Sequence, residues 1–255
     1  MAEIPFYETD KAVSEYLLFH YGSSEEILPY PNGPVSALHY PVRCVVECVD
    51  SGLLEPGARA LDLGCAVGRS ALELARICKS VIGIDYSQSF IDAANTLVKN
   101  GSLSYSRFEE GELTTELTAS IPEGVEVNRV DFQQGDASKL PDDIGTFDVV
   151  LAANLIDRLE NPLAFLESLP GLLNPGGQLV ITSPYTWLEE YTPKENWIGG
   201  FQDENGLKRT LAGLVLVLGD HFSQVREVDL PFLIREHARK FQWSVAQGTV
   251  WIRKG

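Results

Sequence analysis

A short stretch of small residues beside an aspartate is the part of the chain whose chemistry is most easily read. An apolar run ends in Leu61-Asp62-Leu63 and passes into Gly64-Cys65-Ala66-Val67-Gly68. Gly64 allows a tight turn and lets a ligand approach the backbone closely, while Gly68 lets the following helix pack near the strand. The first N–H groups of that helix are free donors. The pattern predicts a cofactor site that includes Asp62, Gly64, Cys65 and Gly68.

Two residues of this turn discriminate between cofactors. A dinucleotide fingerprint has the form G-x-G-x-x-G, but Ala66 stands where its middle glycine would be and would put a Cβ against a pyrophosphate. The carboxylate of Asp62 repels phosphate and tolerates a cation. Both departures favour S-adenosylmethionine, a sulfonium without phosphate, over NAD. Taken alone, the motif is also compatible with a plain turn that binds nothing.

Further polar residues follow the next predicted strands. Asp85 ends the second one, about 20 residues after Gly64, where an acidic side chain can accept both ribose hydroxyl hydrogens. Asp136 follows the third strand and is expected to accept the adenine amino hydrogen, with the backbone of Ala137 at the ring edge. Tyr86 is expected to cover the adenine face. These residues recur at consecutive strand ends, which favours a binding site over a set of unrelated caps.

Alternating patterns predict the elements that position these residues. Short β-branched runs alternate with helical periodicity, as in parallel strands joined by crossover helices. Strands are predicted at Arg59–Leu63, Val81–Ile84, Val125–Phe132, Phe147–Ala152, Gln178–Thr182, Val225–Leu230 and Ser244–Arg253. Helices are predicted at Thr9–Tyr21, Tyr40–Ser51, Arg69–Cys78, after Ser87, after Asn161-Pro162 and at about Leu207–Gly219. The polar, acidic stretch 101–124 is predicted to be an insertion or a lid. Ligands of such a sheet bind beyond the carboxyl ends of the strands.

Composition narrows the classes of partner. The 255 residues carry 20 Lys+Arg against 36 Asp+Glu, a formal net charge of −16, which argues against nucleic acid and anionic membrane surfaces. A run of about 18 apolar residues, which a membrane span needs, is missing. The acidic N-terminus lacks a signal pattern, so we expect a cytoplasmic protein. The four cysteines form no CxxC and are expected to be buried, reduced thiols, with no metal site.

The successive motifs resemble those of class I S-adenosylmethionine-dependent methyltransferases. The matching segments are LDLGCAVGRS, VIGIDYS, GDA, FDVVLAAN and LLNPGGQLVIT, over Arg59–Ser183. The resemblance implies an α/β, Rossmann-like, doubly wound seven-stranded sheet with an antiparallel last strand. It also implies one methyltransferase domain over 1–255, with an N-terminal helical cap (1–55), a cofactor-binding core (59–183) and a substrate-side helix and strand pair (184–255).

A narrower resemblance covers the rest of the chain. The segments YETDKAVSEYLLFHYG, HYPVRCVVEC and LPFLIREHARKFQWSVAQGTVWIRK resemble the methyltransferase of ovothiol biosynthesis, which occurs as the C-terminal domain of 5-histidylcysteine sulfoxide synthase or as a separate chain. This implies methyl transfer from S-adenosylmethionine to the imidazole π-nitrogen of 5-thiohistidine, giving ovothiol A. A sulfoxide synthase and a lyase of the same pathway are then possible partners.

A charged segment is expected to hold such a substrate. If the sixth strand ends near Leu230, the connection Pro231–Trp243 lies at the ligand edge of the sheet. Its arginines are expected to grip a carboxylate, its glutamate an ammonium, and its histidine the thiolate or imidazole; the residues are Arg235, Glu236, His237, Arg239 and Trp243. The alternative for such a run is a solvated charged loop.

Residues elsewhere complete the expected site. Asn154 follows the fourth strand and is expected to contact the substrate or the methionine moiety, and Tyr185, after the fifth, is expected to form a wall of the substrate pocket. Tyr7, Tyr16, His20 and Tyr21 are expected to close the site from above. Arg43 either binds the methionine carboxylate or pairs with Glu47 one turn along.

The expected mechanism is one of positioning. The sulfonium is already activated, so no catalytic triad is predicted. An acceptor from Glu236, His20 or Asn154 is expected to select the reactive imidazole tautomer, and His237 or an arginine to hold the sulfur away from the methyl group. Other functions stay open: an N- or S-methyltransferase for another small metabolite, an NAD-dependent oxidoreductase, and a catalytically silent binding module.

Overall fold

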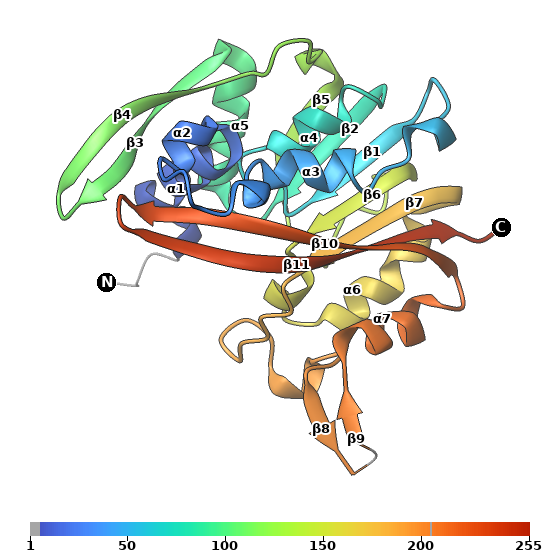
Figure 1. The fold of residues 1–255 in the computed structure, drawn as a ribbon. Helices are drawn as coiled ribbons and strands as arrows, with labels where there is room; N and C mark the ends of the chain where they lie inside the picture. Colours follow the sequence, from blue (N-terminus) through green and yellow to red (C-terminus); the bar gives the residue numbers. More distant parts are fainter. Residues whose placement is uncertain (1–5, 205) are drawn as a thin grey trace.

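The fold is built around one seven-stranded sheet, seen in a computed structural model that describes residues 6–204 and 206–255 (Figure 1). Its strands lie in the order β10-β11-β7-β6-β1-β2-β5. Their bounds are β1 Arg59–Leu63, β2 Ser80–Asp85, β5 Val130–Gln134, β6 Phe147–Ala153, β7 Leu173–Ser183, β10 Phe222–His237 and β11 Lys240–Arg253. Part of the N-terminal stretch used to predict the absence of a signal lies outside the described residues.

The strand directions confirm the predicted sheet. β1 runs parallel to β2 and β6, β6 is parallel to β7, and β2 is parallel to β5. β11 is antiparallel to both β7 and β10. The central strands β1 and β6 are almost wholly buried because helices cover both faces of the sheet. The chain therefore has the predicted Rossmann-like α/β architecture with an antiparallel last strand.

Helices cover the two faces of this sheet (Figure 1). One face packs against α3 (Tyr40–Val46), α4 (Arg69–Leu74) and α5 (Gln88–Asn100), and the other packs against α6 (Pro162–Ser168) and α7 (Thr210–Leu218). The remaining helices, α1 (Asp10–Tyr21) and α2 (Ser24–Ile27), lie near the carboxyl ends of the strands. Three of these helices, α1, α5 and α6, begin with a side-chain cap, because Thr9, Ser87 and Asn161 each accept an N–H of the following helix.

Several predicted bounds were wrong. The helix predicted to reach Ser51 ends at Val46, and the one predicted to reach Cys78 ends at Leu74. The third parallel strand begins at Val130, because Val127–Arg129 form a 3₁₀ turn. The segment before α7 is a small antiparallel pair, β8 (Phe201–Asp203) and β9 (Gly206–Lys208). Helix and strand ends depend on tertiary packing, which periodicity does not report.

Two hairpins extend past the carboxyl edge of the sheet (Figure 1). The stretch predicted as an insertion forms an antiparallel pair, β3 (Ser102–Glu110) and β4 (Leu113–Ser120). The predicted connection Pro231–Trp243 was wrong, because β10 and β11 stay paired from Leu230 opposite Ala246 as far as His237 opposite Lys240. Apolar residues such as Phe232 and Leu233 precede the charged ones, and they are buried against the rest of the protein. Because these apolar residues are buried, the strands continue through this segment, although its charges are typical of a loop.

Candidate functional site

The ends of four parallel strands bring the central site residues together. Because β2, β1, β6 and β7 are adjacent and parallel, the residues that follow them share one edge of the sheet. Those residues are Asp85 at the end of β2, the glycine turn 64–68 after β1, Asn154 after β6 and Tyr185 after β7. The structure thus places these predicted site residues along one edge, with α1 packed nearby (Figure 1).

The glycine turn has a backbone that demands small residues. Gly64, Ala66 and Gly68 have φ of 73°, 47° and 88°, in the left-handed region that favours glycine. A Cβ on Gly68 would lie 2.4 Å from Cζ of Phe132, so the turn packs tightly on β5. The N–H groups of Gly64 and Cys65 both donate to the carbonyl of Ile84, which ties the turn to β2. The Cys65 side chain is buried, and burial raises the pKa of its thiol.

Asp62 offers an acceptor that nothing in the described chain uses. Its side chain is 1% exposed, and its Oδ2 accepts a hydrogen bond from the Ser70 hydroxyl at 2.6 Å. Oδ1 is buried with no hydrogen-bond partner among the described residues. Burial raises the carboxyl pKa to about 7, against the lowering effect of Ser70. A buried, unpaired acceptor of this kind is costly unless a ligand donor supplies the missing bond.

Asp85 connects two motifs that are separate in the sequence. Its Oδ2 accepts the N–H of Ala66 at 2.8 Å, and its Oδ1 accepts the N–H of Ser87 at 2.9 Å. Burial raises its pKa, and the two backbone donors act in the opposite direction. Each carboxylate oxygen has further acceptor capacity, so the side chain can still receive two hydroxyl groups.

The predicted adenine residues are more open. Asp136 accepts the N–H of Ser138 at 2.8 Å and lies 3.7 Å from the Lys139 ammonium, while Ala137 is buried beside it. The Tyr86 side chain is 75% exposed, and the backbone carbonyl of Tyr86 accepts a hydrogen bond from the Gln134 side chain at the end of β5. The ring of Tyr86 is therefore free to cover a ligand, as the sequence predicts, but it is not packed in that position.

Asn154 is held by two residues that the sequence reasoning missed. Its φ is 52°, and its Oδ1 accepts a hydrogen bond from the Tyr40 hydroxyl at 2.7 Å and a longer one from Thr182 at 3.4 Å. The Tyr40 and Thr182 hydroxyls are 2.6 Å apart. Tyr40 lies in HYPVRCVVEC, one of the segments quoted above, but its sequence position does not reveal a partner 114 residues away. The network fixes the side-chain oxygen of Asn154 inside the protein.

Aromatic residues of α1 lie over the glycine turn. The hydroxyl of Tyr21 donates to the Val67 carbonyl at 2.8 Å, which attaches the end of the helix to the turn. The Tyr16 ring lies 4.7 Å from that of Phe90 on α5, and burial raises the pKa of its hydroxyl, with smaller contributions from Tyr7 and Asp85. His20 is 8% exposed, and its Nδ1 has no hydrogen-bond partner in the described chain. Burial, with a smaller contribution from the Arg69 cation, lowers the His20 pKa to about 3, so this imidazole is neutral at physiological pH.

Arg43 and Tyr185 have partners inside the protein. Nε of Arg43 lies 2.6 Å from Oε1 of Glu47, and its Nη1 donates to the carbonyls of Ser36 and Pro231. Of the two sequence alternatives for Arg43, the structure contains the pairing with Glu47, and binding of a methionine carboxylate stays a prediction. Tyr185 has a φ of 56°, and its hydroxyl donates to Gln247 at 2.8 Å. Burial raises the pKa of its phenol.

The charged residues predicted to bind the substrate lie on the β10–β11 hairpin and not at the strand edge. Arg235 is 4% exposed, and its Nη2 lies 2.8 Å from Oε2 of Glu109 on β3. Its Nη1 donates to the carbonyl of Glu26 on α2. The expectation of a free Arg235 at the pocket is therefore corrected, because its guanidinium joins the two hairpins to α2.

Charged neighbours of Arg235 also have partners inside the protein. Glu236 pairs with Lys240 at 2.6 Å, Nδ1 of His237 accepts the N–H of Arg239, and Trp243 is 57% exposed. A cavity of about 200 Å³ between the hairpins is lined by residues of both hairpins and of α1: Lys11, Phe108, Glu109, Glu110, Gly111, Glu236, His237 and Arg239. The predicted site residues thus include two separate groups. The strand-edge group lies at the carboxyl ends of the parallel strands: Asp62, the turn 64–68, Asp85, Asn154 and Tyr185. The hairpin group lies on β10 and β11: Arg235, Glu236, His237, Arg239 and Trp243.

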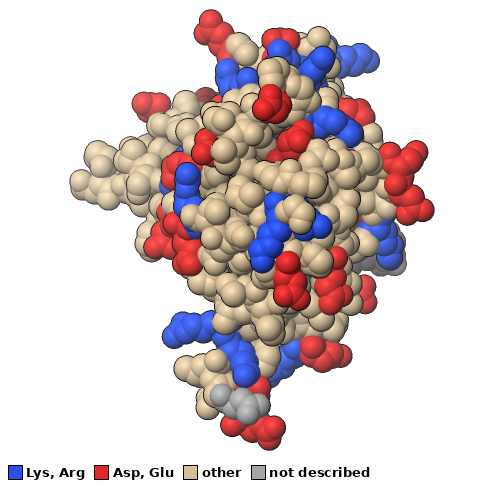
Figure 2. All heavy atoms as spheres, turned by 90° about the vertical axis from the view of Figure 1, so that its right-hand side faces the viewer, with Lys and Arg blue, Asp and Glu red and all other residues tan. Residues whose placement is uncertain are grey.

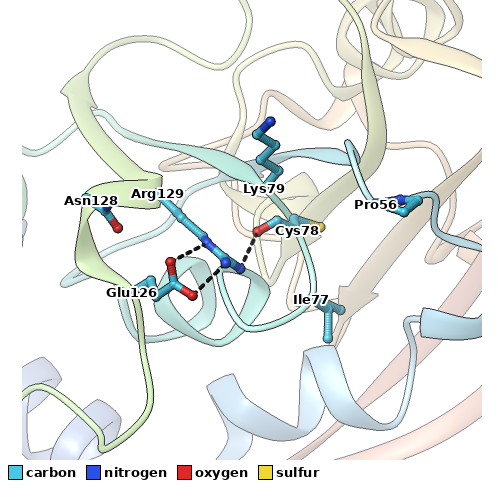
Figure 3. A pocket seen from close by; sticks show the side chains of 7 residues that line it. All are labelled: Pro56, Ile77, Cys78, Lys79, Glu126, Asn128 and Arg129. Carbon is cyan, nitrogen blue, oxygen red and sulfur yellow. Dashed lines mark hydrogen bonds and ion pairs between the residues drawn. The ribbon is translucent and has the colours of Figure 1, made fainter.

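A second cavity, of about 460 Å³, opens at the opposite end of the sheet (Figure 3). Lys79 precedes β2 and Arg129 precedes β5, so this cavity lies at the amino ends of the strands. The Arg129 guanidinium is held by Glu126 at 2.6 Å and by the carbonyl of Cys78. The residues that line this cavity include none of those predicted for the site.

The described residues contain neither a metal-binding cluster nor a membrane-spanning helix. Within 6–204 and 206–255, no three His, Cys, Asp or Glu side chains are grouped so that they could hold a metal ion. Among these same residues, no helix is both long and apolar enough to cross a membrane. On the face shown in Figure 2, Lys and Arg side chains are interspersed with Asp and Glu.

Known proteins resemble the chain over this same region. A family model described as a methyltransferase domain matches residues 61–181. A ubiquinone biosynthesis O-methyltransferase of Xanthomonas euvesicatoria is 29% identical over 154 residues, which are 60% of this chain and 53% of that protein. The chain thus spans about half the length of the curated relatives it matches.

Solved structures share the fold. Magnesium protoporphyrin IX methyltransferase from Synechocystis PCC 6803, determined with bound S-adenosylmethionine, has a TM-score of 0.51 and 17% identity, with 100% of both chains covered. N-methyltransferase NodS from Bradyrhizobium japonicum WM9, in complex with S-adenosylhomocysteine, has a TM-score of 0.52 and 13% identity, covering 95% of this chain and 99% of that one. Residues 61–181 are therefore similar to a methyltransferase domain, and the chain shares its fold with methyltransferases of known structure.

Proposed function

We propose that this protein binds S-adenosylmethionine at the carboxyl edge of its sheet and transfers the methyl group to a small molecule. The observation that carries the proposal is the buried, unpartnered Oδ1 of Asp62 beside the left-handed turn 64–68. An ammonium such as that of the methionine moiety supplies the donor that this oxygen lacks, whereas a pyrophosphate would be repelled by the same carboxylate. The site therefore fits the sulfonium cofactor better than NAD.

The remaining cofactor contacts follow from the strand ends. Asp85 would accept the ribose hydroxyls with the capacity left by its two backbone donors. Asp136 and Ala137 would meet the adenine edge and Tyr86 its face, with Gly64, Cys65 and Gly68 shaping the wall. When bound, the cofactor supplies a methyl group that is already activated for displacement. The protein then needs to orient the acceptor and exclude water, and it needs no strong base.

We further propose that the acceptor is the imidazole π-nitrogen of 5-thiohistidine, so that the product is ovothiol A. Support comes from the resemblance of three segments outside the cofactor motifs to the ovothiol methyltransferase. The aromatic residues of α1 and the polar end of β6 at Asn154 suit a planar, hydrogen-bonding ring. A cytoplasmic location, and a sulfoxide synthase and a lyase as the source of the substrate, belong to the same proposal.

The hairpin residues enter this proposal in a different way. Glu236 and His237 were expected to act on the substrate, and Arg235, Arg239 and Trp243 to bind it. Their partners lie on neighbouring elements, and the 200 Å³ cavity that several of them line is bounded by α1 and β3. We therefore assign the reaction to the strand-edge group, with Asn154, Tyr185, Tyr21 and His20 as the residues nearest the acceptor.

Incubation with S-adenosylmethionine and 5-thiohistidine tests the assignment. Mass spectrometry is expected to show a gain of one methyl group, and NMR is expected to place it on the π-nitrogen. Methylation on sulfur would overturn the nitrogen assignment. No turnover of 5-thiohistidine, with turnover of another small amine, thiol or phenol, would replace the acceptor but keep the methyltransferase.

Cofactor binding is tested separately by calorimetry. S-adenosylhomocysteine should bind and raise the melting temperature, and NAD should do neither. Stabilisation by NAD alone would favour the oxidoreductase alternative. Binding of S-adenosylhomocysteine with no turnover over a broad acceptor panel would favour the silent binding module.

A further inference from the structure

The imidazole of His20 is a buried hydrogen-bonding group with an unused nitrogen. The side chain is 8% exposed, and Nδ1 has no partner in the described chain. Such a group is costly to leave unpaired in a native protein, and it commonly marks a place where a ligand completes the bonding. The low pKa caused by burial keeps the ring neutral, so one of its nitrogens can accept a hydrogen bond.

His20 lies between the residues proposed to bind the cofactor and those proposed to bind the methyl acceptor. One residue further along α1, Tyr21 is bonded to the Val67 carbonyl in the glycine turn. One turn earlier, Tyr16 lies beside His20 with a ring separation of 5.9 Å, and the charge of Asp85 contributes to the raised pKa of the Tyr16 hydroxyl. On the other side, the Phe19 ring is 5.3 Å from His20 and stacks on Tyr40, which binds Asn154. His20 is therefore close to both the cofactor residues and the acceptor residues.

The structure also removes the other candidates for the same task. A heteroaromatic acceptor with two nitrogens must carry its proton on one of them, so that the other has a free lone pair. Glu236 was one candidate to hold that proton, but its carboxylate is paired with Lys240 at 2.6 Å and with Gln242 on the hairpin. Asn154 was another, but its Oδ1 already accepts from Tyr40 and Thr182. Of the three candidates, His20 has the acceptor that remains.

We propose that Nδ1 of His20 accepts a hydrogen bond from the ring N–H of a planar heteroaromatic methyl acceptor, and so turns the unprotonated nitrogen toward the methyl group. The proposal rests on the proposed methyltransferase function and adds the residue that selects the tautomer. No proton is transferred to His20 in this step, because the N–H stays on the substrate and only its direction is fixed. The residue thus determines which nitrogen reacts.

The test compares four proteins with S-adenosylmethionine and 5-thiohistidine: wild type, His20→Phe, His20→Asn and His20→Gln. Phenylalanine keeps the ring and removes the nitrogens. Asparagine places a polar atom near the position of Nδ1, and glutamine places it near Nε2. His221→Phe, at an exposed histidine, serves as the matched control.

His20→Phe is expected to lower kcat/KM for the acceptor by about 10- to 100-fold, through a lower kcat or a higher acceptor KM. The affinity for S-adenosylhomocysteine should stay within about twofold, and the melting temperature should be unchanged or higher, because an unpaired buried polar atom is removed. His20→Asn should recover most of the lost kcat/KM, and His20→Gln should not.

The outcomes separate this inference from the function on which it rests. The role of Nδ1 is overturned if His20→Phe transfers the methyl group as fast as wild type. It is also overturned if His20→Asn and His20→Gln restore the activity equally. A fall in S-adenosylhomocysteine affinity or in melting temperature that matches the loss of activity assigns His20 to structure instead. A wild-type protein that neither binds S-adenosylhomocysteine nor transfers methyl overturns the proposed function itself, and the inference with it.

Discussion

The backbone N–H of Ala66 donates to Oδ2 of Asp85 at 2.8 Å, which joins the glycine turn after β1 to the end of β2. The other oxygen of Asp85 accepts the N–H of Ser87, the cap of α5. One carboxylate therefore organises both places where the cofactor is proposed to bind. Disturbing it should affect cofactor binding more than any single contact in the turn.

Replacing Asp85 by asparagine is expected to weaken S-adenosylhomocysteine binding by at least about tenfold, measured by calorimetry, because charge-assisted hydrogen bonds are lost. The amide also faces a backbone N–H with its own donor, so unfolding free energy should fall by about 1–3 kcal/mol. Asp131→Asn, at an exposed carboxylate on β5, is the control and should change neither quantity. Wild-type affinity in Asp85→Asn would refute the ribose assignment.

Asp62 predicts a specific dependence of stability on pH. Its folded pKa of about 7 is above the unfolded value near 3.9, so the folded state binds more protons between these values. This group therefore makes the free protein less stable as the pH rises from about 4 to about 7, by at most about 4 kcal/mol. Asp62→Asn should remove that slope and be more stable than wild type at pH 8. Denaturant unfolding at a series of pH values measures the difference, and identical slopes for the two proteins would contradict the assignment.

Cofactor affinity should respond to Asp62 in the opposite sense. The ionised carboxylate is the form that binds an ammonium, so wild-type affinity for S-adenosylhomocysteine should weaken as the pH falls through about 7. Asp62→Asn should bind at least about tenfold more weakly at pH 8 and vary little with pH over this range. An unchanged affinity at pH 8 would remove Asp62 from the cofactor site.

The left-handed turn predicts different effects on stability for two small substitutions. Gly68→Ala places a Cβ 2.4 Å from Cζ of the buried Phe132 at a φ of 88°, so it should destabilise the protein by about 2–5 kcal/mol. Ala66→Gly relieves a φ of 47° without removing the N–H bound to Asp85, so its stability should stay within about 1 kcal/mol of wild type. Thermal unfolding and calorimetry compare the two, and equal tolerance of both would show that the turn adopts another conformation.

The ion pair between Arg235 and Glu109 separates a structural role from substrate binding. Glu109→Gln leaves a buried guanidinium without its countercharge and should lower unfolding free energy by about 1–3 kcal/mol. The acceptor KM and the S-adenosylhomocysteine affinity should stay within about twofold. Glu110→Gln, at the exposed neighbour on the same strand, is the control. A rise of tenfold or more in the acceptor KM for Glu109→Gln, without loss of stability, would return Arg235 to the substrate site.

Local sequence was sufficient to place the residues that are proposed to bind the cofactor. A strand that ends at Leu63, a turn that needs glycine, and an aspartate at the next strand end are each encoded within a few residues. Parallel pairing then brings strand ends together without further information, because neighbouring parallel strands share one edge. The fold class and the position of Asp62, Gly64, Gly68 and Asp85 relative to one another followed for this reason.

Only the tertiary structure determined how the remaining polar groups are used. Arg235 meets Glu109, Arg43 meets the Pro231 carbonyl, and Tyr40 meets Asn154, all across more than a hundred residues of chain. The charged run in 231–243 resembled a loop because the apolar residues before and after it find their partners only when α1 and the hairpins pack together. A charged or polar side chain can bind a substrate or a neighbour, and the choice depends on which groups the folded chain brings within hydrogen-bonding distance and shields from water.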